Sequence, residues 1–265
     1  MRDKIENKKI IITGSSGGLG EKIAWHIAKN GGIPIMLARS IDKLENVQRK
    51  MKQELDANSF VYQVDLMNEK LLVHTFDRIL IEHEKVHGLI NNAGLGIFDF
   101  VNDLDWKDID RMFQLNVYAL IQATKIVLPH FVDLKGNCHI INIASQAGKI
   151  ATPKSAVYAA TKHAVLGFTN SLRLELANER VFVTAVNLGP VQTDFFKLAD
   201  PFGTYQANIG KYMLDPDDVA KKIVANLFRQ KREINLPWWM DMGSRFYHLF
   251  PKTMEVLLHK QFNKK

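Results

Sequence analysis

The sequence predicts an α/β fold built on a doubly wound, seven-stranded parallel sheet, in a single domain that spans residues 1–265. Two observations support this prediction. Short apolar runs alternate with amphipathic helical stretches, which is the order expected for a parallel sheet covered by helices on both faces. A chain of 265 residues, 46% of them hydrophobic, is also large enough to bury one sizeable core. We find no internal repeat, linker or low-complexity segment that would divide the chain.

Each expected element is a short apolar run or a helical stretch. The seven expected strands are residues 9–13, 33–38, 59–64, 88–91, 139–144, 181–187 and 233–236. The six expected helices are residues 19–30, 41–55, 69–85, 106–131, 155–177 and 216–229. Two segments fall outside this alternation: residues 193–215, which we expect to form a loop, and the C-terminal tail, residues 237–265.

Charge and cysteine usage exclude several classes of protein. The net charge is +7, but the basic residues are spread through the expected helices, so we expect a solvated basic surface and no nucleic-acid site. The first residues lead from a charged stretch directly into a strand, and no uninterrupted apolar run approaches the ~20 residues that span a bilayer. We therefore expect a cytoplasmic protein. Cys138, the single cysteine, lies in an apolar run and is expected to be a buried, inert thiol.

A glycine-rich turn follows the first expected strand, with the sequence Thr13-Gly14-Ser15-Ser16-Gly17-Gly18-Leu19-Gly20. Glycines there let the backbone approach a pyrophosphate at the N-terminus of the next helix. Such a turn can also serve only to join a strand to a helix. Its position after the first strand of an α/β pattern favours a dinucleotide site, and with it a Rossmann-like fold.

Further motifs follow in the order of one known family. Asn91-Asn92-Ala93-Gly94 follows the fourth strand, and Tyr158 and Lys162 are four residues apart. Together with the glycine spacing, these motifs resemble the short-chain dehydrogenase/reductase family over residues 9 to about 193. The resemblance implies an oxidoreductase that transfers a hydride between a nicotinamide cofactor and a carbonyl or alcohol substrate.

The resemblance also implies which residues form the site. The catalytic set would be Asn116, Ser145, Tyr158 and Lys162. The cofactor would contact Gly14, Ser15, Ser16, Gly18, Leu19, Gly20, Asp65, Leu66, Asn92, Ala93, Gly94, Tyr158, Lys162, Gly189, Val191 and Thr193. Leu188 stands where the family usually has a proline, which would leave that turn less rigid. No metal site is expected.

The proposed reaction centre can also be examined as chemistry. Tyr158 and Lys162 lie at positions i and i+4, so they share one face of a helix, and a nearby ammonium is expected to lower the pKa of the phenol. Ser145 follows the fifth strand, at the sheet edge where such folds bind ligands, and its hydroxyl can hold a substrate oxygen. In the family, the residue matching Asn116 holds a water that links the lysine to solvent. The resemblance thus implies a proton route through Lys162 and the cofactor ribose to Tyr158.

The choice of cofactor depends on the end of the second strand, where an acidic residue would bind the ribose hydroxyls of NAD. The sequence there is Ala38-Arg39-Ser40, with no carboxylate. Arg39 can pair with a 2′-phosphate, and the hydroxyls of Ser15 and Ser40 are expected to lie within reach of the same phosphate. These residues favour NADP(H), although Gly17 stands where NADP-preferring relatives often carry a second basic residue.

The substrate side is expected to be apolar. Residues 193–215 contain Phe195, Phe196, Leu198, Phe202, Tyr205, Tyr212 and Met213, and in this family that segment folds over the substrate. Leu95, Gly96 and Phe98 are candidates for a second wall of the pocket. A small to medium, apolar carbonyl or alcohol is the expected substrate, with ordinary packing of these side chains as the alternative.

The last expectations concern the C-terminal tail and the oligomeric state. Residues 237–265 are rich in aromatics and end in lysines. We expect this tail to pack beside the substrate segment or a partner subunit, with peripheral membrane contact as the less favoured alternative. The resemblance implies a homodimer or homotetramer. The rival function is a catalytically silent, dinucleotide-binding regulatory or interaction protein; a sugar-nucleotide epimerase of extended type would need a larger C-terminal part.

Overall fold

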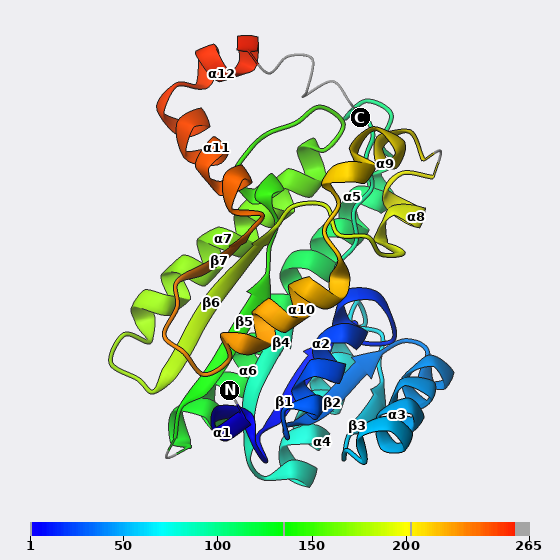
Figure 1. The fold of residues 1–265 in the computed structure, drawn as a ribbon, viewed down its shortest axis with the longest axis vertical. Helices are drawn as coiled ribbons and strands as arrows, with labels where there is room; N and C mark the ends of the chain where they lie inside the picture. Colours follow the sequence, from blue (N-terminus) through cyan, green and yellow to red (C-terminus); the bar gives the residue numbers. More distant parts are fainter. Residues whose placement is uncertain (1, 135, 202, 258–265) are drawn as a thin grey trace.

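The computed structural model describes residues 2–134, 136–201 and 203–257 and contains one seven-stranded, wholly parallel sheet (Figure 1). Its spatial order is β3-β2-β1-β4-β5-β6-β7, so the chain winds outward from β1 in both directions. The strands are β1 (Lys9–Thr13), β2 (Ile33–Ala38), β3 (Phe60–Gln63), β4 (Val86–Asn91), β5 (Cys138–Ile143), β6 (Val181–Leu188) and β7 (Glu233–Leu236). This confirms the predicted doubly wound, Rossmann-like sheet.

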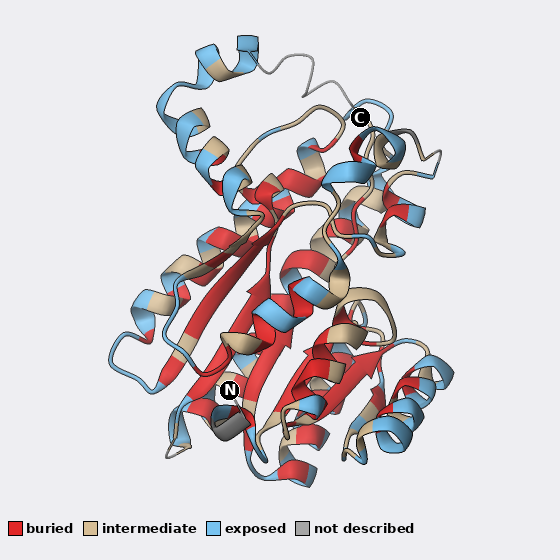
Figure 2. Cartoon of the chain, viewed as in Figure 1, coloured by how far each residue is buried: buried red, intermediate tan, exposed pale blue. Residues whose placement is uncertain are grey.

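Helices cover both faces of the sheet. One hydrophobic cluster joins the sheet to α2 (Gly18–Lys29), α3 (Ile41–Leu55) and α10 (Pro216–Ala225). A second cluster joins the opposite face to α4 (Glu69–His83), α6 (Ala119–Asp133) and α7 (Ala156–Glu175). The central strands are therefore buried on both sides, as Figure 2 shows. Cys138 lies in this core, and burial raises the pKa of its thiol to about 11, which fits the expected inert thiol.

The helical stretch predicted at residues 106–131 differs from the expectation in one useful detail. It consists of α5 (Trp106–Phe113), a π-helical turn at Gln114–Tyr118, and α6, which continues to Asp133. Such wide turns often occur at functional sites. The turn here contains Asn116, which is buried. The stretch Trp106–Asp133 is also long and apolar enough to cross a bilayer, but in this fold α6 packs against the sheet.

The two segments that fall outside the expected alternation, residues 193–215 and the tail, contain short helices. Residues 193–215 form α8 (Phe195–Ala199), α9 (Thr204–Ile209) and a 3-10 turn at Gly210–Tyr212. The tail forms α11 (Trp238–Leu249) and α12 (Pro251–Leu257), which extend away from the sheet beyond β7 (Figure 1). A further turn of helix, α1 (Arg2–Ile5), precedes β1. These helices are mostly too short for their periodicity to be recognised in a sequence.

The expectation that the tail packs beside the substrate segment is met only at the start of α11. There the ring of Trp239 lies 6.2 Å from that of Tyr212. Most of the remaining apolar side chains of α11 and α12 are exposed. Phe202 and residues 258–265 lie outside the described part of the chain.

Candidate active site

The expected site residues gather at the carboxyl edge of the sheet. The glycine turn follows β1, Asn92 follows β4, and Ser145 follows β5. Because β1 pairs with β4 and β4 pairs with β5, these three segments are neighbours. Open α/β sheets bind ligands where the strand order reverses, and here the order reverses between β1 and β4.

The glycine turn is shaped by its close approach to the segment after β4. Gly14 has a positive φ of 67°, and a Cβ there would lie 2.9 Å from the Cα of Ala93. A Cβ on Gly20 would collide with the carbonyl oxygen of Gly14 and lie 2.6 Å from Nδ2 of Asn92. At Gly17, before α2, a Cβ would meet no atom within 4 Å. The N-terminus of α2 is therefore open on this side, which suits the pyrophosphate of a dinucleotide.

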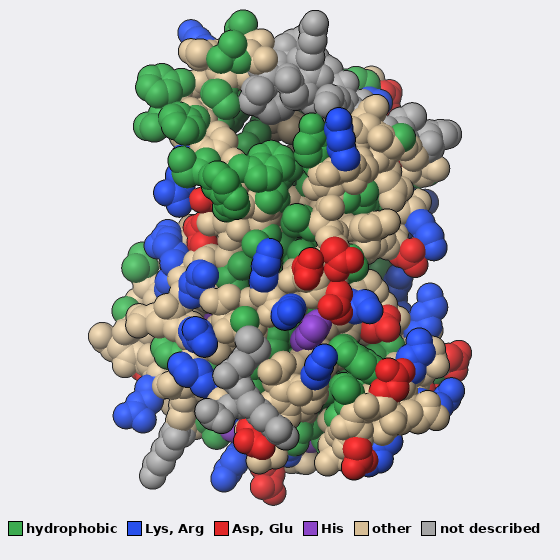
Figure 3. Space-filling view, viewed as in Figure 1, with side chains coloured by type: hydrophobic (Ala, Val, Ile, Leu, Met, Phe, Trp, Pro, Cys, Tyr) green, Lys and Arg blue, Asp and Glu red, His purple; other side chains and the backbone are tan. Residues whose placement is uncertain are grey.

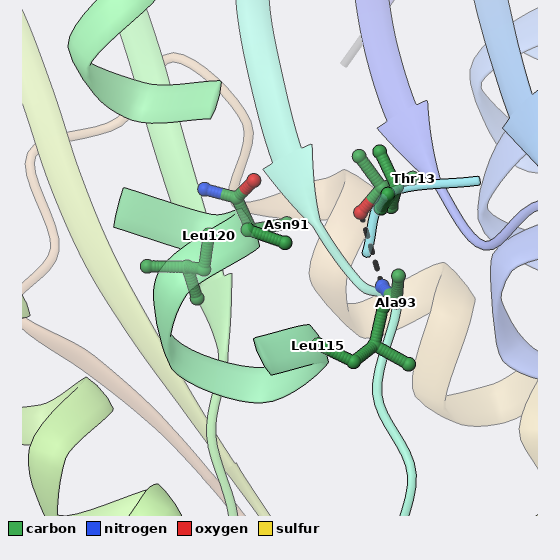
Figure 4. Close-up of a pocket in the computed structure, with 7 residues that line it drawn as sticks. Thr13, Asn91, Ala93, Leu115 and Leu120 are labelled. Atoms are coloured by element: carbon green, nitrogen blue, oxygen red, sulfur yellow. Dashed lines mark hydrogen bonds between the residues drawn. The ribbon is translucent and has the colours of Figure 1, made fainter. Parts of the chain in front are cut away.

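Thr13 joins the two segments and was missed as a site residue. Its Oγ1 accepts hydrogen bonds of 3.0 Å from the backbone N–H groups of both Asn92 and Ala93. Figure 4 shows the bond to Ala93. In return, Nδ2 of Asn92 donates to the carbonyl oxygens of Thr13 and Gly14. The cavity beside Thr13 and Ala93 has a volume of about 10 Å³ and can hold at most one water. The sequence signal was available, since Thr13 begins the glycine motif.

Tyr158, Ser145 and Lys162 come together as predicted from their order. The Ser145 side chain lies close enough to the Tyr158 phenol to lower its pKa, and Ser145 Oγ donates to the carbonyl of Leu188 at 3.3 Å. Ser145 Oγ also accepts from the N–H of Ala147 at 3.1 Å, which fixes the hydroxyl at the start of a short 3-10 turn. Lys162 Nζ lies 5.8 Å from the centre of the Tyr158 ring and donates to the carbonyl of Ile143 at 2.9 Å. Tyr158 and Lys162 are both buried.

Burial controls the titration of this pair. It raises the pKa of Tyr158 to about 12, and the nearby Ser145 side chain works against that rise. Burial also lowers the pKa of Lys162 to about 8. The expected lowering of the phenol pKa by Lys162 is thus not found in this arrangement, because the ammonium is bonded to the carbonyl of Ile143 and desolvation dominates.

Asn116 fastens the Asn-Asn-Ala-Gly segment to the helix of Tyr158. Its amide accepts from the N–H of Leu95 at 2.9 Å and donates to the carbonyl of Leu95 at 2.8 Å. It also donates to Oγ1 of Thr161 at 3.1 Å. A Cβ on Gly94 would lie 3.2 Å from Asn116 Oδ1 and 3.6 Å from Lys162 Nζ. The structure therefore brings Asn116 to Lys162, with Gly94 leaving the space between them open.

Aromatic rings cover Tyr158 from the substrate side. The ring centres of Phe98 and Phe195 lie 5.6 Å and 5.8 Å from that of Tyr158, and Tyr205 lies 5.6 Å from Phe98. Gly96 permits this packing, because a Cβ there would lie 2.6 Å from Cζ of Phe195. Both expected walls of the pocket therefore contribute to a cluster that we call the aromatic cover: Phe98, Phe195, Phe196 and Tyr205.

The adenosine side of the expected cofactor site is partly corrected. Ser15 is fully buried, and its hydroxyl donates to the carbonyls of Ile12 and Leu37 at 3.1 and 3.4 Å. Its hydroxyl therefore points into the protein and away from the phosphate position for which it was considered. Arg39 is exposed at the end of β2, and its carbonyl accepts from Nε2 of Gln63 at 2.9 Å.

The other residues expected to bind the adenosine half of the cofactor lie in different local structures. Ser40 precedes the first residue of α3, and Ser16 and Leu19 lie partly exposed in the glycine turn. Asp65 follows β3 closely, and its carboxylate accepts from the N–H of Met67 at 3.1 Å. Leu66 is buried and packs in the core beneath the sheet edge.

Three of the expected cofactor-binding residues lie in the turn after β6, and each makes a different contact. Thr193 lies beside Gly18, since a Cβ on that glycine would be 3.4 Å from the Thr193 side chain. Val191 pairs with Leu214 across the substrate segment. Gly189 makes room for the tail, because a Cβ there would lie 2.8 Å from Sδ of Met240. Its role is thus also structural.

A buried ionic cluster connects the turn after Ser145 to the tail. Lys149 Nζ lies 2.6 Å from Oε2 of Glu233 and 2.7 Å from Oδ1 of Asp241. It also donates to Oδ1 of Asn235 at 3.1 Å. Sequence reasoning missed this cluster, and no local signal could have revealed it, because the partners of Lys149 are 84 to 92 residues away.

A doubly wound parallel sheet whose carboxyl edge carries an open glycine turn beside a Tyr-Ser-Lys cluster defines a dinucleotide-dependent oxidoreductase. The chain belongs to the short-chain dehydrogenase/reductase family, because the family model for short chain dehydrogenases matches residues 8–201.

Individual relatives support the family assignment. The chain is 30% identical over 236 residues to an NADP-dependent 3-hydroxy acid dehydrogenase of Schizosaccharomyces pombe, covering 87% of this chain and 91% of that one. It is 26% identical to a short-chain dehydrogenase of Sphingobium yanoikuyae solved with NADPH, with a TM-score of 0.79 and coverage of 91% and 94%. A Burkholderia phymatum enzyme solved with NAD has a TM-score of 0.83 and coverage of 99% and 98%, but at 21% identity it shows the fold alone.

Proposed function

We propose that this protein is an NADP(H)-dependent oxidoreductase that interconverts a carbonyl and an alcohol on a small to medium, apolar substrate, with Tyr158 as general acid and base. The observation that carries the proposal is the gathering of the Tyr158 phenol, the Ser145 hydroxyl and the buried ammonium of Lys162 beneath the aromatic cover. A binding protein without turnover has no need of a buried phenol, an anchoring hydroxyl and a buried lysine in one place.

The residues at the sheet edge have separate roles in the proposed reaction. When bound, the nicotinamide supplies or accepts the hydride, which is chemistry that the protein itself lacks. Ser145 and Tyr158 lie close enough to hold one substrate oxygen between their hydroxyls. Tyr158 gives a proton to that oxygen during reduction and takes it back during oxidation. Lys162, buried beside the phenol, favours the phenolate form when it is charged.

The cofactor preference rests on Arg39. A 2′-phosphate beside an exposed guanidinium forms charge-assisted hydrogen bonds, while a carboxylate in that place would repel it. NADP-linked and NADPH-bound relatives fit this preference. The glycine turn and the N-terminus of α2 would hold the pyrophosphate of either cofactor, so they do not discriminate between the two.

The substrate class rests on the aromatic cover. Phe98 and Phe195 lie against the Tyr158 ring, and Tyr205 packs on Phe98. A substrate that reaches the Tyr158 hydroxyl would lie against this cover. Rings of this kind favour apolar or aromatic groups and exclude water from the reacting oxygen. A strongly hydrated substrate such as a free sugar would lose its water shell there without compensating hydrogen bonds.

The proposal is tested by a substrate screen with the full-length protein. Apolar ketones, aldehydes and secondary alcohols, alongside free sugars of similar size, would be incubated with NADPH or NADP⁺ while absorbance at the nicotinamide band is followed. We expect turnover with members of the apolar set and little with the sugars. Tight NADPH binding without turnover of any substrate would favour the regulatory function, and preferred turnover of sugars would refute the substrate class.

Arg39→Ala is expected to weaken NADPH binding by about tenfold and to leave NADH binding unchanged, because only NADPH carries the phosphate that Arg39 would pair with. The dissociation constants can be measured by the fluorescence of the bound nicotinamide. Arg49→Ala is the matched control, because it removes another exposed arginine, from the helix α3 that follows Arg39. It should alter neither dissociation constant. Equal loss of NADPH and NADH affinity in Arg39→Ala would contradict the assignment.

A further inference from the structure

The helix α11 is amphipathic in an unusual direction, with its polar side toward the protein and its apolar side outward. Asp241 and Ser244 are its buried residues. The apolar side chains of Trp238, Met242, Phe246 and Leu249 recur every three or four residues, which places them on one stripe of the helix. All four are exposed, Trp238 at 73% and Leu249 at 69%.

The buried ionic cluster fixes this orientation. Asp241 pairs with Lys149 at 2.7 Å, so the polar side of α11 is tied to the turn after Ser145. Within α11, Asp241 also pairs with Arg245 at 3.0 Å, and the Ser244 hydroxyl donates to the carbonyl of Asp241 at 2.8 Å. Rotating α11 to bury its apolar stripe would remove Asp241 from Lys149 and leave buried charges unpaired, which is costly. The apolar stripe is therefore held facing outward.

The stripe extends into a larger apolar surface. Trp239 and Phe250 add to it from either end of α11, and α12 contributes Val256 and Leu257; all four are exposed. Figure 3 shows hydrophobic side chains gathered over α11 and α12 at the upper left of the molecule. We call this surface the tail patch: Trp238, Trp239, Met242, Phe246, Leu249, Phe250, Val256 and Leu257. Contiguous apolar surface of this kind marks an interaction site.

The charge around the tail patch indicates what covers it. Arg245 and Lys252 are exposed beside the apolar side chains. Of the two acidic residues in residues 237–257, Asp241 is buried and paired, and Glu255 accepts a hydrogen bond from the Tyr247 hydroxyl at 3.0 Å. Within residues 237–257 the two basic residues balance the two acidic ones. Over residues 237–265 the net charge is +3, because the chain continues beyond the described part with Lys260, Lys264 and Lys265. A second copy would bring the same positive charge to the contact, whereas an anionic surface would complement it.

We propose that the tail patch docks this protein on the surface of an anionic lipid bilayer. Tryptophan and phenylalanine on a helix that also carries basic residues are typical of helices that lie in the interface between lipid and water. The patch lies on helices that extend beyond the sheet, so it can reach a planar surface without a groove (Figure 1). Its first turn contacts Tyr212 of the substrate segment, so docking would bring that segment close to the lipid.

Co-sedimentation of the full-length protein with lipid vesicles tests the proposal without any use of activity, so its outcome is independent of the proposed function. One set of vesicles would be phosphatidylcholine alone, and the other would contain a third of phosphatidylglycerol. We expect binding to the anionic vesicles that weakens at high ionic strength, and much weaker binding to the neutral ones.

The triple variant Trp238→Ser/Leu249→Ser/Phe250→Ser is expected to weaken vesicle binding by at least about tenfold, because it removes three exposed side chains that would enter the lipid. Trp106→Ser/Ile81→Ser is the matched control, since these residues are 80% and 77% exposed but belong to α5 and α4 and not to the tail patch. It should bind vesicles as the native protein does. Circular dichroism would verify that both variants fold.

Three results would overturn the proposal. In the first, the native protein binds neither kind of vesicle. In the second, the triple variant and the control lose vesicle binding equally. In the third, sedimentation velocity shows a dimer of the native protein that the triple variant alone disrupts. The last result would assign the tail patch to contact between two copies of the chain.

Discussion

Tyr158→Phe is expected to lower kcat by ~10²–10⁴-fold on a verified substrate while leaving NADP(H) binding unchanged, because positioned acid–base groups typically contribute that much. The substitution removes the hydroxyl beside Ser145 but keeps the ring. The contacts of that ring with Phe98 and Phe195 are therefore retained. Steady-state kinetics measure the loss, and cofactor fluorescence measures the binding.

Tyr118→Phe is the matched control for this prediction, because Tyr118 is 54% exposed and lies in the π-helical turn away from the phenol of Tyr158. Its kcat should equal that of the native protein. Near-native turnover in Tyr158→Phe would show that another group transfers the proton, even though the fold and family would stand. A parallel loss of cofactor affinity would instead indicate that the variant disturbs the site as a whole.

Lys162→Met is expected to lower kcat/KM by at least about a hundredfold and to weaken NADP(H) binding as well, which separates it from Tyr158→Phe. The proposed roles of Lys162 are to favour the phenolate of Tyr158 and to hold the ribose. Methionine keeps most of the buried volume. It removes the ammonium that lies 5.8 Å from the Tyr158 ring and the hydrogen bond to Ile143.

The dependence of the rate on pH gives a readout that a merely structural role of Lys162 would not change. Burial raises the pKa of Tyr158 to about 12. The proposed electrostatic role requires the Lys162 ammonium to turn from the carbonyl of Ile143 toward the phenol, where its charge would oppose that rise. Oxidation of an alcohol needs the phenolate, so its rate increases with pH. Without the ammonium the pKa of Tyr158 rises further, and the increase should shift to higher pH in Lys162→Met. An unshifted profile would contradict the electrostatic role, and Lys125→Met serves as a control for loss of a lysine on a neighbouring helix.

The strands were predictable because their signal is local. Runs such as Ile10-Ile11-Ile12 are apolar at every position, as expected for a strand buried on both faces, and the structure buries all three completely. The site motifs were predictable in their order for a related reason. Parallel strands end at a common edge, so residues that follow β1, β4 and β5 must come together there, as Gly14, Asn92 and Ser145 do.

Side-chain direction could not be predicted from the same motifs. Ser15 lies in the glycine turn as expected, but the carbonyls of Ile12 and Leu37 take its hydroxyl, and Leu37 belongs to another strand. The pKa of Tyr158 is likewise decided by burial under Phe98 and Phe195, which come from two distant segments. Spacing along the chain specifies that Tyr158 and Lys162 are neighbours, but it does not specify which atom Lys162 bonds to.

The sequence by itself determined the doubly wound parallel sheet and the edge at which the site motifs meet, because these follow from periodicity and from the geometry of parallel strands. Only the tertiary structure decided the direction in which α11 faces. The sequence of that helix is amphipathic in either case, and one expects its apolar side to be buried. The ion pair between Asp241 and Lys149 holds the polar side inward instead. Leaving a buried carboxylate without a cation costs more free energy than leaving aromatic side chains exposed to solvent.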